Sequence, residues 1–189
     1  STNYTLRRDK VSLADSYCDP AAPLLSLADC AQQGTYLTSL VGYGIRLDKR
    51  NDPINPTRAF YAEFAQDFAG LGGDVNYIST RGGGGWYHGF SRTIILSLIG
   101  EAGYIQGWGG DTVRINDRFY KGGDSFRGFE TAGIGPRDTN FGRSDSLGGK
   151  MYAIGTAELR IPTGLPDQYG IKAALFSDFG TLGTLDSKD

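Results

Sequence analysis

The stretch TYLTSLVGYGIRL at residues 35–47 decides the fold of this chain, because its side chains alternate in character. One set of alternate positions is polar or small and includes Gly42, Gly44 and Arg46. The other set is mostly apolar or aromatic and comprises Leu37, Val41, Tyr43, Ile45 and Leu47. Successive side chains of a β-strand point to opposite faces, so the pattern predicts a strand with one apolar and one polar face.

Six further runs show a similar alternation, and helical periodicity is nearly absent from the chain. The runs span residues 3–13, 58–69, 76–87, 93–104, 150–161 and 170–180. Runs of about ten residues are longer than most strands and have the length of a tilted membrane-crossing strand. The sequence therefore predicts an all-β protein, part of an antiparallel transmembrane β-barrel with about seven strands.

The segments between these runs alternate in length. Residues 48–57, 89–92 and 165–169 are compact turns, whereas residues 14–34 and 108–149 are long. Short turns at one end and long loops at the other are typical of outer-membrane barrels. We therefore expect residues 14–34 to form an extracellular loop and residues 108–149 to form a second, very long one.

A soluble β-sandwich is the alternative, because its strands alternate in the same way around an apolar core. Two features favour the membrane. The polar faces are rich in glycine, serine, threonine and charge, as a water-filled lumen would be. Tyr43 and Tyr104 lie on the other face near the predicted strand ends, where an aromatic girdle would sit.

The composition of the 189 residues excludes several other classes. The net charge of −2 and a charged fraction of 21% give no indication of nucleic acid binding. No run of about twenty apolar residues predicts a transmembrane helix, and no signal peptide is recognisable. The only histidine, His88, has no second histidine to support a metal site. We find no catalytic constellation, and we expect a protein that is not an enzyme and carries neither metal nor cofactor.

The two cysteines, Cys18 and Cys30, predict a disulfide and an oxidising compartment. Their separation fits neither a four-ligand metal site nor a Cys-x-x-Cys redox pair. The alternative is a pair of free thiols. The chain also begins at Ser1 and stops after Asp189 without a recognisable end signal, so we expect a segment of a longer protein with an open sheet edge on each side.

The most informative motif is GGDSFRGF at residues 122–129, in the middle of the longest loop. Loops of this length without secondary structure are uncommon and are usually functional or disordered. This one carries several aromatic residues, which a disordered linker would not need. The motif therefore predicts an ordered loop tip in which Arg127 is paired.

The chain resembles the BamA family of outer-membrane barrel insertases in three pieces. YKGGDSFRGFE at residues 120–130, followed by GIGPR at residues 133–137, is similar to the family's sixth extracellular loop with its (V)RGF motif. Phe126 stands where that motif usually has valine. Residues 148–162 and 174–181 are similar to the two strands that follow, and LDKRNDP at residues 47–53 fits a periplasmic turn of the family.

The resemblance implies a sixteen-strand barrel preceded by POTRA domains that this segment lacks. It implies that the loop at residues 108–149 folds back into the lumen, where Arg127 contacts acidic residues on the two following strands. Matched by position, these are Glu158 and Asp178, and the alternation places both on polar faces. We expect Gly128 to permit a close backbone approach that a Cβ would block. We expect Phe129 to anchor the loop tip by packing.

The function that the resemblance implies is folding and insertion of β-barrel proteins in the bacterial outer membrane, without nucleotide hydrolysis. The expected partners are outer-membrane lipid, unfolded barrel clients and accessory assembly lipoproteins, but not nucleic acid. Two alternatives remain open. One is a two-partner secretion pore of the same superfamily, and the other is a plain porin or adhesin barrel.

Overall fold

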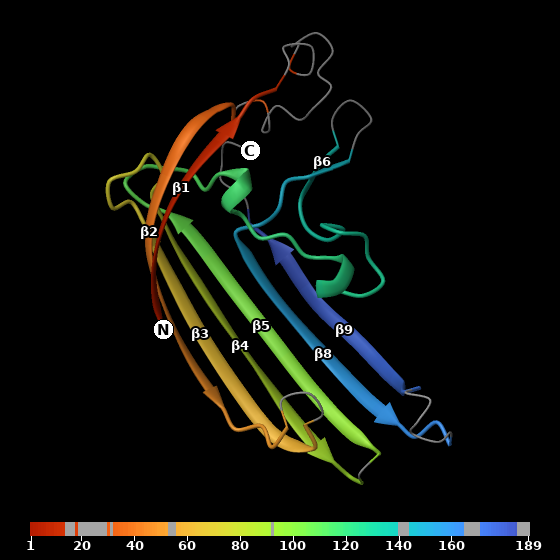
Figure 1. Cartoon of the computed structure of the whole chain (residues 1–189). Helices are drawn as coiled ribbons and strands as arrows, with labels where there is room; N and C mark the ends of the chain where they lie inside the picture. The colour runs from red at the N-terminus through yellow and green to blue at the C-terminus, as the bar shows by residue number, and fades with distance from the viewer. Residues whose placement is uncertain are drawn as a thin grey trace.

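The wall of the molecule is one curved antiparallel sheet of seven strands (Figure 1). The computed structural model describes residues 1–13, 18, 30, 32–52, 56–91, 93–139, 144–164 and 171–184. The strands are β1 (Thr2–Val11), β2 (Gly34–Asp48), β3 (Arg58–Ala69), β4 (Tyr77–Gly89), β5 (Ile95–Gly107), β8 (Met151–Ile161) and β9 (Ala173–Gly183), paired in that order. Since β1 and β9 pair with no other described strand on their outer sides, the sheet curves without closing. The predicted all-β, antiparallel partial barrel is confirmed.

The loop between β5 and β8 contains the remaining elements. They are two short 3-10 turns, η2 (Ile115–Asp117) and η3 (Gly123–Ser125), and a small two-stranded sheet of β6 (Arg137–Asp138) and β7 (Asp145–Ser146). Figure 1 shows this loop turning back across the concave side of the wall. Within the described residues, no helix is long and apolar enough to cross a membrane.

The predicted strands agree with the observed ones to within three residues at each end. β3 has the predicted bounds, whereas β9 ends three residues later than the predicted run at residues 170–180. Residue 170 itself lies outside the described residues. β8 determines this shift, because its Met151 pairs with Gly183 and its Ile161 with Ala173. Pairing along a neighbour, rather than local alternation, sets where a strand ends.

The convex face of the sheet is apolar and exposed. Among the large hydrophobic side chains exposed on it are Val41, Ile45, Phe60, Phe64, Phe68, Trp86, Leu98, Met151, Leu175 and Phe179. No second sheet packs against this face among the described residues, so the β-sandwich alternative is wrong. A contiguous exposed apolar surface of this kind marks a membrane or protein interface.

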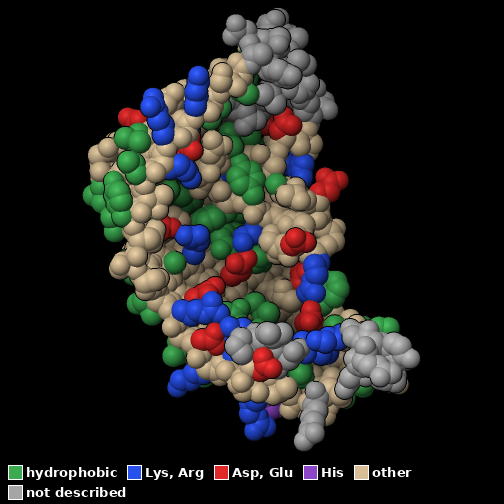
Figure 2. Space-filling view, in the orientation of Figure 1, with side chains coloured by type: hydrophobic (Ala, Val, Ile, Leu, Met, Phe, Trp, Pro, Cys, Tyr) green, Lys and Arg blue, Asp and Glu red, His purple; other side chains and the backbone are tan. Residues whose placement is uncertain are grey.

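The concave face is polar and hollow (Figure 2). It encloses a cavity of about 810 Å³, and the wall side chains around it include Arg46, Glu63, Arg81 and Glu101. A small apolar core lies beside the start of the long loop and comprises Ala69, Val75, Tyr77, Ile105 and Val113. The concave face is therefore polar and hollow along the wall, and it is packed with apolar side chains where the loop begins.

Tyr43 and Tyr104 both lie exposed on the convex face. Tyr104 is near the end of β5, but Tyr43 lies in the interior of β2, so its predicted place near a strand end is wrong. The two tyrosines share a row of paired residues through Gln66 and Thr80. Gln66 accepts a hydrogen bond from the Tyr43 hydroxyl (3.0 Å) and donates one to the Thr80 hydroxyl (2.9 Å). Polar groups on this outward face therefore satisfy one another, as a lipid-facing surface requires.

Cys18 and Cys30 form the predicted disulfide. Most of the predicted extracellular loop at residues 14–34 lies outside the described residues. Gln33, which is described, donates a hydrogen bond from Nε2 to the Cys18 sulfur at 3.5 Å. The disulfide therefore lies close to the start of β2.

Candidate functional site

The long loop is tied to the concave face of the wall before its motif begins. Phe119 exchanges two backbone hydrogen bonds of 2.9 Å with Gly149, just before β8. Its ring packs edge-on against Tyr152 of β8, with ring centroids 4.8 Å apart. The loop therefore returns along the inside of the sheet rather than projecting away from it.

The tip of the loop is a closed turn built on glycine. The Ser125 hydroxyl accepts a hydrogen bond from the Gly122 amide (3.0 Å) and donates one to the Gly122 carbonyl (2.8 Å). The Gly123 amide donates to the Phe129 and Glu130 carbonyls at 3.0 and 3.1 Å. Gly122 has φ +138°, and an added Cβ would lie 2.0 Å from the Glu130 carbonyl oxygen. Only glycine permits this close return of the chain.

Arg127 projects from this turn onto the last two strands. Its Nε and Nη2 donate to the two carboxylate oxygens of Asp178, each at 2.8 Å, and its Nη1 donates to Glu158 Oε2 at 2.9 Å. The Arg127 amide also donates to Asp178, at 3.2 Å. The structure thus brings together the three residues paired in the sequence analysis. The geometry is a bidentate fork with a second carboxylate on the remaining nitrogen.

Two neighbours fix this cluster further. The Arg127 guanidinium lies over the Phe176 ring, 3.6 Å from its centroid, and Thr156 donates to Asp178 at 2.7 Å. The Asp178 side chain is only 6% exposed, whereas those of Arg127 and Glu158 are about one-third exposed. Hydrogen bonds to Asp178, followed by those to Glu158, raise the pKa of Arg127 above its ordinary value. Arg127 therefore stays charged, and the carboxylate of Asp178 lies at the buried centre of the cluster.

The aromatic residues beside Arg127 have different roles. Phe126 is buried, and Phe129 lies half-exposed against its edge, with ring centroids 5.3 Å apart. Phe126 is therefore the packed residue of the tip. Phe129 packs against Phe126, as expected of a residue that anchors the tip, but half of its surface stays exposed.

The reason expected for Gly128 is wrong. Nothing lies within 4 Å of the position that a Cβ would occupy there, so close approach does not require glycine. Gly128 has φ +87°, a left-handed conformation that residues with a Cβ rarely adopt. Its role is to turn the backbone immediately after Arg127.

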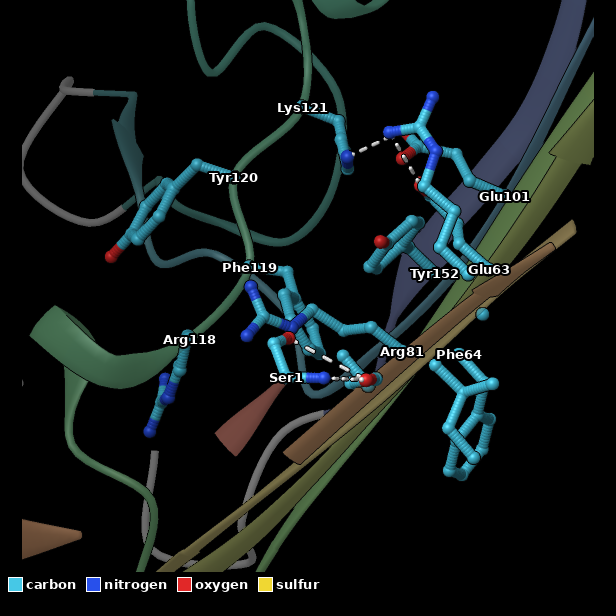
Figure 3. Close-up of a pocket in the computed structure, with 15 residues that line it drawn as sticks. Ser1, Glu63, Phe64, Arg81, Glu101, Arg118, Phe119, Tyr120, Lys121 and Tyr152 are labelled. Carbon is cyan, nitrogen blue, oxygen red and sulfur yellow. Dashed lines mark hydrogen bonds and ion pairs between the residues drawn. The ribbon is translucent and has the colours of Figure 1, made fainter. Parts of the chain in front are cut away.

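Lys121 makes a second contact between loop and wall, which the sequence analysis missed. Its ammonium donates to Glu101 Oε1 of β5 at 2.6 Å and lies 4.1 Å from the centroid of the Tyr152 ring (Figure 3). The Lys121 side chain is only 13% exposed. The sequence did place Glu101 on the polar face of its strand, which indicates that a cation could pair with it. Alternation alone does not show which cation that is.

Replacing Lys121 by methionine is expected to destabilise the loop base by about 1 kcal/mol, the sum of a cation–π contact and a partly exposed ion pair. Hydrogen exchange of the loop amides in the full-length protein measures this opening. The matched control is Lys172→Met, outside the loop. A Lys121 variant with unchanged exchange at residues 119–123 would show that this contact does not hold the loop.

Two other titratable groups, His88 and Asp67, pack or pair within the wall. Among the described residues, no group of three or more His, Cys, Asp or Glu side chains could hold a metal ion. His88 is stacked on Trp86 and lies edge-on to Phe90, with ring centroids 5.4 and 4.9 Å apart. Asp67 is paired with Arg81 across neighbouring strands. These groups line and stabilise the wall.

Comparison with known proteins places this geometry in a family. The chain matches the Omp85 superfamily domain over residues 1–189. It is 39% identical over 154 residues to the outer membrane protein assembly factor BamA of Neorickettsia risticii, covering 81% of this chain and 20% of that protein. It is 30% identical over 158 residues to BamA of Neisseria meningitidis serogroup B, covering 82% and 20%. The sorting and assembly machinery component 50 homolog of Homo sapiens is 32% identical over 146 residues, covering 72% and 29%.

The fold has a counterpart among solved structures. The crystal structure of BamA from Haemophilus ducreyi lacking POTRA domains 1-3 superimposes with a TM-score of 0.72 at 22% identity, covering 80% of this chain and 31% of that one. The chain spans about a fifth of the length of the two bacterial relatives. The family match covers every residue, and the predicted resemblance of the chain to the BamA family is confirmed. The chain belongs to the Omp85 superfamily.

Proposed function

We propose that this chain is a barrel-wall segment of a bacterial outer-membrane protein assembly factor, which folds and inserts other β-barrel proteins. The two BamA relatives are named outer membrane protein assembly factors. The exposed apolar convex face and the polar, hollow concave face fit a wall between lipid and lumen. The proposed partners are outer-membrane lipid, unfolded barrel clients and accessory assembly lipoproteins.

The observation that carries the proposal is the bidentate contact of Arg127 with Asp178, completed by Glu158. It fixes a loop inside the wall and joins it to two consecutive strands. A plain pore would need an open lumen, whereas this contact holds a long loop on the concave side of the wall. The contact therefore favours an assembly factor, which would bind its clients at a strand edge of the wall, over a porin, which would conduct solutes through the lumen.

The proposed mechanism needs no nucleotide. A client strand pairs with an exposed strand edge at a seam of the complete barrel, where main-chain hydrogen bonds provide the affinity. We assign this segment the role of scaffold and loop holder rather than seam. Holding β8, β9 and the loop together keeps the wall rigid while the seam opens elsewhere.

The test is client folding by the full-length protein reconstituted in liposomes. Addition of the protein is expected to accelerate the folding of an unfolded β-barrel client, measured by its shift in electrophoretic mobility without heating. Arg127→Met is expected to lower that rate at a temperature where the variant barrel remains folded, and Arg8→Met, on an exposed position of β1, serves as the control. A protein that leaves client folding unchanged but gives a large steady conductance would be a porin. Export of a secreted partner through the lumen would indicate a secretion pore.

A further inference from the structure

The charged side chains of the wall strands are sorted by sign between the two faces of the sheet. Alternation and pairing place every Asp and Glu of the seven strands on the concave face, where each one belongs to an ion pair. The convex face of the same strands carries Arg8, Lys10 and Arg58 but no carboxylate. The outward face is therefore positively charged, and no acidic side chain of the strands neutralises it.

Lys49 and Arg58 lie at the end of this face where β2 continues into β3 and β4 into β5 (Figure 1). Lys49 follows the last residue of β2. Its amide donates to the Phe60 carbonyl at 2.9 Å, and its ammonium lies 5.9 Å from the centroid of the Phe60 ring. Arg58 lies two residues before Phe60 on the same face of β3, opposite His88 of β4. Both basic residues are exposed, and neither forms an ion pair with a described carboxylate.

Aromatic side chains lie beside these two cations on the convex face. Trp86 is paired with Phe60 across neighbouring strands, and His88 is stacked on Trp86 and lies edge-on to Phe90. Phe60, Trp86 and Phe90 are 43%, 46% and 65% exposed, so their outer surfaces are open. Aromatic rings next to Lys and Arg at the end of a lipid-facing strand are typical of the level at which a membrane meets water. This end of the wall therefore has the composition of a surface for lipid head groups.

We infer that Lys49 and Arg58 bind the phosphate of an anionic phospholipid at the rim of the barrel. The inference rests on the proposed function, in which the convex face contacts outer-membrane lipid. Ammonium and guanidinium groups form charge-assisted hydrogen bonds with phosphate oxygens. The acyl chains of the same lipid lie along the apolar convex face, against Phe60 and Trp86. The short turns of outer-membrane barrels lie on the periplasmic side, so the lipid belongs to the periplasmic leaflet.

The charge of the site selects an anionic lipid over a zwitterionic one. A zwitterionic head group carries its own cation, which Lys49 and Arg58 would repel, and it has no net charge to offset theirs. Basic residues next to a membrane gain affinity for anionic lipid with each added charge. We therefore expect phosphatidylglycerol to be enriched over phosphatidylcholine beside these residues.

Quenching of Trp86 fluorescence tests this inference, because Trp86 lies beside Phe60 and His88. The full-length protein is reconstituted in vesicles of equal parts phosphatidylglycerol and phosphatidylcholine, with brominated acyl chains on one lipid or on the other. The part of the fluorescence that Trp86→Phe removes is expected to be quenched at least about threefold more strongly by brominated phosphatidylglycerol. Equal quenching by the two lipids would overturn the inference.

Variants assign the lipid selectivity to the two cations. The double variant Lys49→Met/Arg58→Met is expected to remove the preference, whereas Lys49→Arg/Arg58→Lys is expected to keep it. Arg46→Met, which removes a positive charge from the concave face, is the control for charge and is expected to leave the preference unchanged. Heat-modifiable mobility verifies that each variant barrel is folded. A folded double methionine variant that keeps the wild-type preference would contradict the assignment.

Failure of this inference and failure of the proposed function give different results. Lipid selectivity without any acceleration of client folding would overturn the proposed function alone. Acceleration of client folding without lipid selectivity would overturn the inference alone.

Discussion

Arg127→Ala is expected to lower the free energy of unfolding of the full-length barrel by about 3 kcal/mol, the low end of the cost of breaking a buried ion pair. The low end applies because Arg127 and Glu158 are about one-third exposed, while Asp178 is buried. Loss of the guanidinium leaves the Asp178 carboxylate with Thr156 as its only remaining side-chain donor among the described residues. Denaturant unfolding followed by heat-modifiable electrophoretic mobility measures the loss.

The control for Arg127→Ala is Arg8→Ala, on an exposed position of the first strand, which is expected to change stability by less than about 0.5 kcal/mol. Equal losses in the two variants would contradict the proposed role of the contact. Arg127→Lys separates charge from geometry, since lysine keeps the charge but cannot form the bidentate fork. A double-mutant cycle with Asp178→Asn then isolates the coupling between the two side chains.

Gly122→Ala is expected to destabilise the folded-back loop by about 3 kcal/mol or more. Its backbone conformation is accessible almost only to glycine, and the added methyl would meet the Glu130 carbonyl and the Gly133 amide. Because the clash is with backbone, no side-chain rotation relieves it. Limited proteolysis of the full-length protein is expected to show new cleavage near residues 120–135.

Gly128→Ala is the matched comparison. It has the same requirement for positive φ but open space around the added Cβ, so it is expected to cost only about 1–2 kcal/mol. A loss at Gly128 as large as at Gly122 would mean that steric crowding is not what distinguishes the two positions. The two variants together test whether Gly122 is required because the chain passes close to it, and Gly128 only because of its backbone conformation.

The loop touches the wall at widely separated strands. Asp117 is paired with Arg7 of β1, Lys121 with Glu101 of β5, and Arg127 with Glu158 of β8 and Asp178 of β9. A loop that joins the first, middle and last strands of the sheet couples its own position to the curvature of the wall. Flattening the wall would have to break at least one of these ion pairs.

The sequence by itself determined the strands and their faces, because alternation with a period of two is a local property. It placed Glu158 and Asp178 on the polar side for the same reason. It also identified the arginine loop, since a long aromatic-rich connection in which glycine follows an arginine can be recognised in the sequence itself. The disulfide followed from the cysteine count and spacing.

Only the tertiary structure decided which groups meet across the hollow. Alternation shows the face on which Glu101 lies but does not show that Lys121 reaches it. It also gives no sign that Arg114 is buried against the Tyr36 ring. The sequence analysis gave the wrong reason for Gly128 and wrongly placed Tyr43 near a strand end. The space around a Cβ and the final length of a paired strand both depend on residues distant in the sequence. Contacts between a loop and a distant wall depend on where the chain returns, and a period-two pattern carries no information about that return.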